Sequence, residues 1–185
     1  MLTSTLTDRI ASPDHLRPFD LRPLPTVLTA SAFGRIPAPT DVVFQVDDDA
    51  GLALAAARAD VIRIAFSRRV PTLTAATELI AALEDEIAAV GRHRRDVTVL
   101  LEVEVRVMPD ETSARARRAH LAQLDALAGL AWSPRPTRVV GVGRQVVDDA
   151  ASLATRAGAD GAVLVPLSPA ADLERLHAMV ASTRQ

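Results

Sequence analysis

The sequence contains no cysteine and no lysine, and all 21 of its basic residues are arginine. The absence of cysteine excludes a disulfide framework, a thiolate metal site and a cysteine nucleophile. The absence of lysine excludes a lysine nucleophile, a Schiff base and the lysine of a P-loop. Any chemistry performed by this chain must therefore use other side chains.

Aromatic residues are also scarce, at 3% of the chain, although 49% of the residues are hydrophobic. The core must therefore be built from alanine, valine, leucine and isoleucine, a composition typical of helices stacked on parallel strands. At 185 residues the chain suits one domain, which at this size buries about 70% of its unfolded surface.

Neither the charge nor the hydropathy pattern indicates a nucleic-acid or membrane partner. The net charge is −2 and the arginines are scattered, except for the cluster at residues 92–95, which we interpret as the cationic end of a helix. No apolar run approaches the roughly 18 residues of a membrane span. The first ten residues lack the basic-then-apolar order of a signal peptide. We expect a cytoplasmic protein.

The first 40 residues differ from the rest because they hold half of the twelve prolines, at positions 13, 18, 23, 25, 37 and 39. Proline at this density breaks any regular period. We therefore predict a proline-rich N-terminal arm over residues 1–40, with one short strand at Thr26–Ala30, and a single domain over residues 41–185.

Residues 41–185 alternate between strand-like and helix-like patterns. Such alternation predicts an α/β fold with parallel strands of one sheet, joined by right-handed crossovers and covered by outer helices. The four clear strands are predicted at Asp41–Val46, Asp60–Phe66, Val97–Val105 and Ala162–Pro166. Eight strands are needed to close a (β/α) barrel, so the chain predicts a partial barrel. Charged residues alternate in the second half of the third strand, which predicts a wet face or an edge position.

The segment Val139–Leu176 resembles the end of the bacterial luciferase-like flavin-dependent monooxygenases, which carry a VGTPEQVADxLxxLxxAGADGFxLxP pattern. The residues in register include Gly141, Gln145, Asp148, the run from Gly158 to Gly161, and Pro166. Upstream, the segment from Val42 to Phe66 is similar to the family's VVxQAGxSxAGxxLAARxADxVF. The branch that it resembles includes nitrilotriacetate and long-chain alkane monooxygenases.

This resemblance implies a TIM-type (β/α) barrel with flavin mononucleotide (FMN) or a deazaflavin at the carboxyl ends of the strands. It also implies that Gln45 and Gly51, which match the family's QAG loop, bind the cofactor, whereas no catalytic residue can be carried over. The chain lacks the family's N-terminal strands. Its loop has lost the glycine and serine of QAGxS.

Asp47, Asp48 and Asp49 replace those residues and leave three explanations open. A carboxylate at a helix N-terminus acts as a cap, and its negative charge also repels a phosphate that would bind there. Two like charges about 4 Å apart repel by about 4 kcal/mol at an effective dielectric of 20. A cap, a divalent cation site and a retained phosphate site therefore compete, although the consecutive spacing differs from that of a calcium loop.

The remaining candidate residues give little indication of a catalytic or binding site. The four histidines (His15, His93, His120 and His177) show no metal-binding spacing, and we expect no metal site. Residues 141–145 resemble part of a dinucleotide glycine loop but are better interpreted as the turn that enters a helix. Trp132 is either an aromatic lid or a packed side chain.

Two functions from different classes follow. The chain is either a truncated flavin-dependent monooxygenase or oxidoreductase that completes its site with another chain, or an inactive half-barrel that acts as an interaction or structural module. An incomplete barrel leaves strand edges unpaired, so either function predicts a homodimer or a companion subunit.

Overall fold

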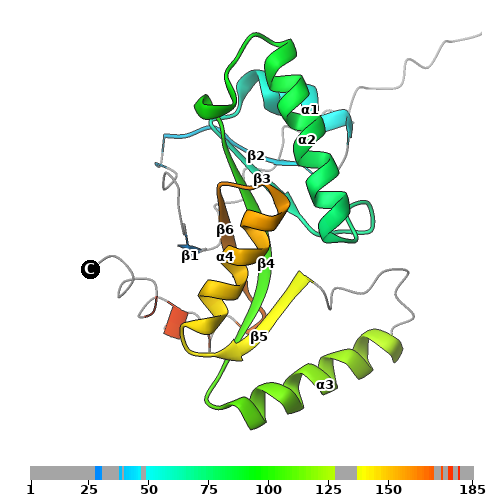
Figure 1. Ribbon diagram of the computed structural model, residues 1–185, viewed down its shortest axis with the longest axis vertical. Helices are drawn as coiled ribbons and strands as arrows, with labels where there is room; N and C mark the ends of the chain where they lie inside the picture. Colours follow the sequence, from blue (N-terminus) through cyan, green and yellow to red (C-terminus); the bar gives the residue numbers. More distant parts are fainter. Residues whose placement is uncertain are drawn as a thin grey trace, which may run out of the picture.

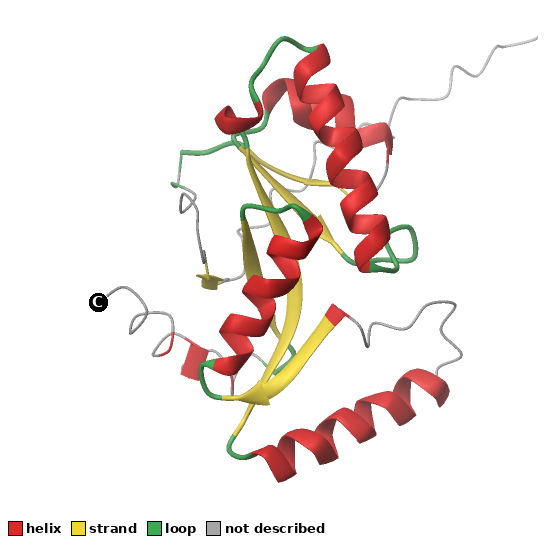
Figure 2. Cartoon of the chain, viewed as in Figure 1, coloured by secondary structure: helices red, strands yellow, loops and turns green. Residues whose placement is uncertain are grey.

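The computed structural model describes residues 28–30, 38, 40–46, 49–127 and 137–168, together with residues 172, 175, 176 and 179. These residues form one curved sheet with helices packed against it (Figures 1 and 2). The strands are β1 (Leu28–Ala30), β2 (Val43–Val46), β3 (Val61–Ala65), β4 (Thr98–Met108), β5 (Arg138–Val142) and β6 (Gly161–Pro166). The helices are α1 (Asp49–Arg58), α2 (Leu73–Ala89), the 3₁₀ turn η1 (Arg94–Asp96), α3 (Glu111–Leu127) and α4 (Gln145–Ala157).

The four predicted strands are confirmed as β2, β3, β4 and β6, and they lie side by side and parallel in the order β2-β3-β4-β6. The predicted α/β class with parallel strands and flanking helices is therefore correct. β1 falls within the predicted short strand at Thr26–Ala30 and pairs antiparallel with β6. β5 was not among the predicted strands, and it pairs parallel with the second half of β4.

The prediction of an edge position or wet face for the second half of β4 was wrong. β4 is the central strand, with β3 and β5 on parts of its length and β6 along its middle. Its odd-numbered residues from Val99 to Val107 are buried, and its charged even-numbered residues are half-buried rather than exposed. The alternation therefore separates two faces that are both largely covered.

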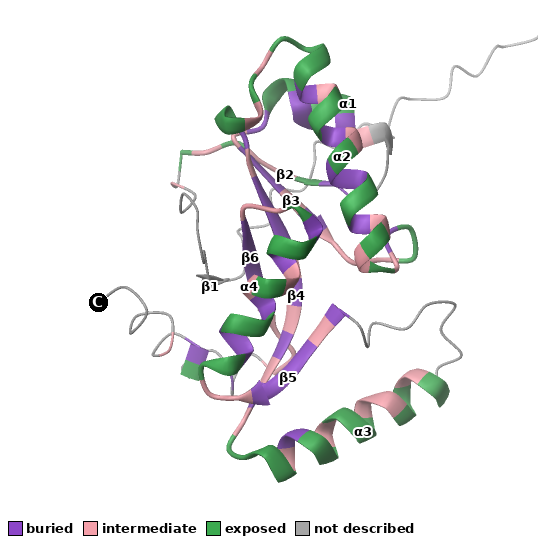
Figure 3. Ribbon diagram, in the orientation of Figure 1, coloured by how far each residue is buried: buried purple, intermediate pink, exposed green. Residues whose placement is uncertain are grey.

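The main core lies on one face of the sheet, which we call the outer face. Odd-numbered β4 residues, Ile62, Ile64 and Leu164 pack there against buried residues of α1, α2 and α4. In α2 the buried positions Leu79, Leu83 and Ile87 repeat at helical spacing. Figure 3 shows this division, with buried residues along the sheet and along the sheet-facing side of α2.

The ends of the helices follow local rules. Thr72 caps α2 by accepting the Ala75 N–H, and Pro71 lies one residue before this cap. Asp110 caps α3 by accepting the N–H of Ser113 at 2.7 Å. That hydrogen bond lowers the pKa of Asp110 below its ordinary value. Gly158 ends α4 at a φ of +84°, a conformation that favours glycine.

Candidate functional site

The two predicted cofactor-binding residues lie near the carboxyl end of β2. Gln45 is the third residue of β2 and is exposed, and its register partner on β3 is Arg63. Gly51 lies in the first turn of α1 and is half-buried. Because the β2–α1 connection is short, the fold brings both residues to one end of the sheet. Cofactor binding by Gln45 and Gly51 stays a prediction.

The acidic loop between these residues is described only in part. Asp49 is the first residue of α1. Asp47 and Asp48 lie outside the described residues. The cap, cation and phosphate explanations therefore remain predictions, with one acidic residue placed at the positive end of the α1 dipole.

The loop after β3 adds two arginines that the sequence analysis did not consider. β2 and β3 are parallel neighbours, so the loops that follow them meet at the same edge of the sheet. Ser67 Oγ accepts the N–H groups of Arg69 and Val70 at 3.2 Å, and Arg68 and Arg69 are exposed. The pair of arginines shortly after a strand was the available signal. It places positive charge at the edge of the sheet where β2 ends.

The face of the sheet opposite the main core, which we call the inner face, carries a buried ion pair. Arg63 Nη2 of β3 lies 2.6 Å from Glu102 Oε1 of β4, and the two side chains are only 12% and 14% exposed. Among the described residues, neither Arg63 Nε nor Glu102 Oε1 has a hydrogen-bond partner of good geometry. Burial raises the pKa of Glu102 above its ordinary value, and the attraction of Arg63 offsets this only in part.

Two further ion pairs extend along β4. Glu104 Oε2 accepts from Arg138 Nε of β5 at 2.9 Å, and Arg138 also contacts Asp125 of α3 at 3.4 Å. Arg106 Nη1 donates to Asp172 Oδ2 at 2.9 Å, and Asp172 is fully buried. The charged row of β4 therefore binds β3, β5 and the segment after β6, and Arg138 of β5 links this row to α3.

These pairs account for every inner-facing charged residue on the described strands. By the alternation of strand residues and the registers of the sheet, that set is Arg63, Glu102, Glu104, Arg106 and Arg138. Each member lies within 3 Å of an opposite charge. The inner-face arginines are thus already neutralised, and they fit a flavin phosphate poorly.

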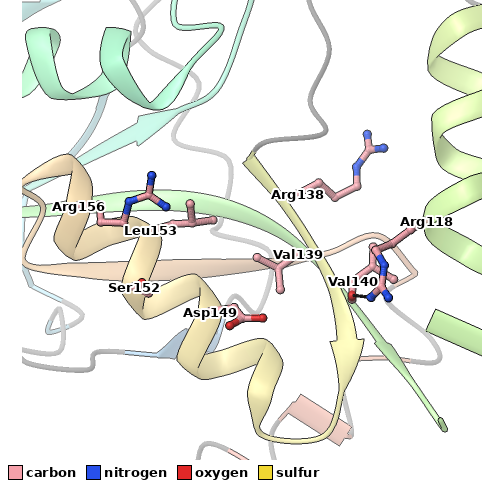
Figure 4. A pocket seen from close by; sticks show the side chains of 8 residues that line it. All are labelled: Arg118, Arg138, Val139, Val140, Asp149, Ser152, Leu153 and Arg156. Carbon is pink, nitrogen blue, oxygen red and sulfur yellow. Dashed lines mark hydrogen bonds between the residues drawn. The ribbon is translucent and has the colours of Figure 1, made fainter. Parts of the chain in front are cut away.

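A groove of about 370 Å³ lies elsewhere, along β5 between α4 and Arg118 of α3. Figure 4 shows Asp149, Ser152, Leu153 and Arg156 along α4, with Val139 and Val140 of β5 beside them. Arg118 donates to the Val140 carbonyl at 2.7 Å and pairs with Glu111. The groove follows the first residues of β5, whereas the sites of (β/α) barrels lie at the carboxyl ends of strands. Its position therefore does not match that of a barrel active site.

The cluster at residues 92–95 was predicted to form the cationic end of a helix, and this was wrong. Its arginines bind other elements. α2 ends at Ala89, before the cluster. Arg92 donates to the Ala56 carbonyl in the last turn of α1. Arg94 binds Glu84, the Val97 carbonyl and Asp160. The two arginines therefore join α1, α2 and the amino ends of β4 and β6.

The other candidates are placed as follows. Residues 143 and 144 form the turn between β5 and α4, in agreement with the predicted turn that enters a helix. His93 and His120 are exposed, whereas His15, His177 and Trp132 lie outside the described residues. No cluster of three or more acidic or histidine side chains within the described ranges could hold a metal ion. None of the described helices is long and apolar enough to span a bilayer.

Comparison with known proteins supports the fold and goes no further. No protein-family model and no curated protein matches the sequence. Among solved structures, the chain is similar to EDTA monooxygenase (EmoA) from Chelativorans sp. BNC1 at 17% identity and a TM-score of 0.55. It is also similar to riboflavin lyase (RcaE), solved with a modified FMN and riboflavin, at 14% identity and 0.56, and to long-chain alkane monooxygenase (LadA) at 16% and 0.55.

Coverage separates this chain from those structures. The matches include 80%, 77% and 77% of this chain, but only 47%, 42% and 40% of the respective solved chains. The chain therefore spans less than half the length of these proteins. At such low identity the likeness shows a shared fold, and the chain has the architecture of a partial (β/α) barrel.

Proposed function

We propose that this chain is a shortened homologue of the luciferase-like flavin-dependent monooxygenases that works as an interaction or structural module without flavin chemistry. The resemblance of Val139–Leu176 to that family and the likeness to two monooxygenases and a riboflavin lyase support the ancestry. The observation that carries the proposal is the inner face, where every described strand charge is engaged in an ion pair. These charges hold the sheet to its neighbours and are not available to a ligand.

A second function remains as an alternative because of the carboxyl end of β2. Gln45 is exposed there on the inner face, and the loop with Arg68 and Arg69 lies next to it. Together with Gly51 at the start of α1, these residues could hold a phosphate of FMN or a deazaflavin if another chain supplied the rest of the pocket. In that case the chain is a subunit of an oxidoreductase, and the bound flavin would supply the redox chemistry.

The visible spectrum of the protein purified from a flavin-producing host separates the two functions. The module predicts a colourless protein, and the oxidoreductase subunit predicts a yellow one, at least in the presence of its partner. A variant that combines Asp47→Gly with Asp48→Ser removes two negative charges and restores a loop closer to QAGxS. If the acidic loop alone prevents binding, this variant gains weak FMN affinity when the rest of the pocket is present.

A wild-type protein that retains FMN through purification would contradict the module. It would also show that the loop accepts a phosphate despite its carboxylates, and the subunit function would then take precedence. As a control for adventitious colour, free FMN is removed by gel filtration before the spectrum is recorded.

A further inference from the structure

The groove along β5 has no part in the module proposed above. Its volume of about 370 Å³ lies at the lower end of the roughly 300–1,000 Å³ of pockets that hold small molecules. The residues that line it come from three elements, α3, β5 and α4. A small molecule in the groove would therefore contact all three.

One wall of the groove is a polar stripe along α4, formed by Asp149, Ser152 and Arg156. These residues follow one another at spacings of three and four, so they share one face of the helix. All three are exposed. Two helical turns, or about 10.5 Å along the axis, separate Asp149 from Arg156. Figure 4 shows these two residues at opposite ends of the stripe.

The charges at the two ends of the stripe are not used within the described part of the chain. There, neither Arg156 nor Asp149 forms an ion pair or a side-chain hydrogen bond. A position in the last turn of α4 favours a positive charge at Arg156 through the helix dipole, but it leaves the guanidinium without an acceptor. A guanidinium presents a planar fork of N–H donors that matches a carboxylate.

A second guanidinium enters the groove from α3. Arg118 is held in place because it donates to the Val140 carbonyl at 2.7 Å. Its ion partner is Glu111, and the two side chains are 44% and 55% exposed. Exposed pairs of this kind contribute little, so the charge of Arg118 is only weakly neutralised. Arg138, the third arginine of the lining, is already paired with Glu104 and Asp125.

The groove also offers an apolar surface next to these charges. Val139 of β5 is 8% exposed and packs in the main core, and half-buried Leu153 of α4 packs against that core. Both line the groove, and Leu153 lies one turn before Arg156. An aliphatic body of a few carbon atoms could therefore cover the two side chains while its charged end reaches Arg156.

We propose that this groove binds a small aliphatic carboxylate, with the carboxylate on Arg156, Arg118 across the groove, and the aliphatic body on Val139 and Leu153. One unpaired arginine matches one negative charge, and the unpaired Asp149 repels a second. The site goes beyond the proposed module, because it requires neither flavin nor another chain. It also lies away from the carboxyl ends of the strands, where (β/α) barrels hold their ligands.

An NMR titration of the full-length protein with isocaproate, a branched monocarboxylate, tests the site. We expect saturable shifts of backbone amide signals in β5 and α4 around the groove. The uncharged isocaproamide has the same aliphatic body but cannot form charge-assisted hydrogen bonds, so it should bind about tenfold more weakly or worse. Equal affinities for the acid and the amide would overturn the proposal, as would the absence of saturable shifts. This comparison requires no variant.

Two substitutions on α4 should change the affinity for isocaproate in opposite directions. Arg156→Gln removes the cation and should weaken binding by about tenfold. Asp149→Asn removes a like charge and should tighten binding by about twofold, the effect of unit charges about 10 Å apart in water. Weaker binding by Asp149→Asn would indicate a ligand with a positive group and would overturn the carboxylate.

Arg115→Gln is the matched control, because Arg115 is exposed on α3 and is not among the residues that line the groove. It should leave the affinity unchanged, and circular dichroism should show the same fold for all three variants. If Arg115→Gln weakens binding as much as Arg156→Gln, isocaproate binds surface arginines in general and the proposal fails. Retention of FMN bears only on the proposed function, because the groove requires no flavin.

Discussion

The amino ends of the strands and the inner face of the sheet use charged residues in opposite ways. At the amino ends, Asp60 and Asp160 each follow an alanine and precede a strand, and each accepts the N–H at the start of a neighbouring strand. On the inner face, the charges are buried against each other, and Arg63, Arg106 and Asp172 each keep one polar atom without a hydrogen-bond partner among the described residues.

This difference shows which charges contribute net stability. A carboxylate that accepts a backbone N–H satisfies both groups, and hydrogen bonds to charged groups contribute about 1.5–3 kcal/mol. A buried ion pair must first lose its hydration, so it is often no better than a well-packed apolar pair, although loss of one partner is severe. In (β/α) barrels the amino ends of the strands generally serve stability, and the two aspartates fit that pattern.

The largest effect is expected when one member of the most buried pair is removed. Arg106→Leu leaves Asp172, which is fully buried, without its ion partner. Breaking such a pair costs about 3–5 kcal/mol, and urea unfolding at neutral pH measures the loss. The double variant Arg106→Leu/Asp172→Leu should regain most of the stability. A single variant as stable as the wild type would show that the pair is not desolvated.

A smaller loss is expected at the amino ends, where the two aspartates can be compared directly. Asp160 Oδ2 accepts from the Val99 N–H at 2.7 Å and from Arg94 at 2.9 Å. Among the described residues, the Asp60 carboxylate accepts the Val42 N–H at 2.9 Å alone. Asp160→Ala should therefore destabilise the protein by about 1.5–3 kcal/mol and Asp60→Ala by about 1 kcal/mol. Equal losses would mean that Arg94 adds nothing to the Asp160 contact.

The pH dependence of stability should reveal the desolvated carboxyl of Glu102. Its pKa in the folded protein is raised by burial above the ordinary 4.5. On a rise in pH from 4.5, the unfolded chain loses this proton first, so the folded state binds more protons and stability falls until the folded-state pKa is passed. Relative to Glu102→Gln, the wild type should lose free energy of unfolding over that window and remain constant above it. If the free energy of unfolding of the wild type instead rose relative to that of Glu102→Gln as the pH increases, the burial argument would be contradicted.

The smallest effect is expected at the exposed pair that links Arg144 and Asp148. The two side chains are 60% and 63% exposed, and Arg144 Nε lies 3.6 Å from the carboxylate. An exposed pair four residues apart contributes about 0.3–0.5 kcal/mol. Arg144→Ala should therefore change the urea midpoint little, and it serves as the charge-removal control for Arg106→Leu. A loss above about 1 kcal/mol would show that Arg144 makes a contact of greater weight.

The sequence was sufficient to predict the parallel strands because their apolar runs and the intervening helical periods are strong and local. It did not predict β5, because five residues with a glycine before a turn look like a helix entry. The position of β4 was missed for a different reason. The alternation of Glu102, Glu104 and Arg106 cannot show whether the charged face meets water or partners from β3, β5 and the segment after β6.

The candidate site was harder to predict than the fold. Gln45 and Gly51 were found through a family pattern, and the fold places them at one end of β2. The partners of Arg63 and Arg138 depend on the register between strands, which a single sequence does not encode locally. Arg94 and Asp160 are 66 residues apart, so their contact could be seen only once the chain was folded.

The most direct test of the account is a titration of the wild-type protein with FMN, followed by flavin fluorescence. An inner face whose charges serve the fold predicts no saturable change in fluorescence. Saturable binding at micromolar FMN would contradict the account, because it would show that the paired charges and the acidic loop leave a working flavin site.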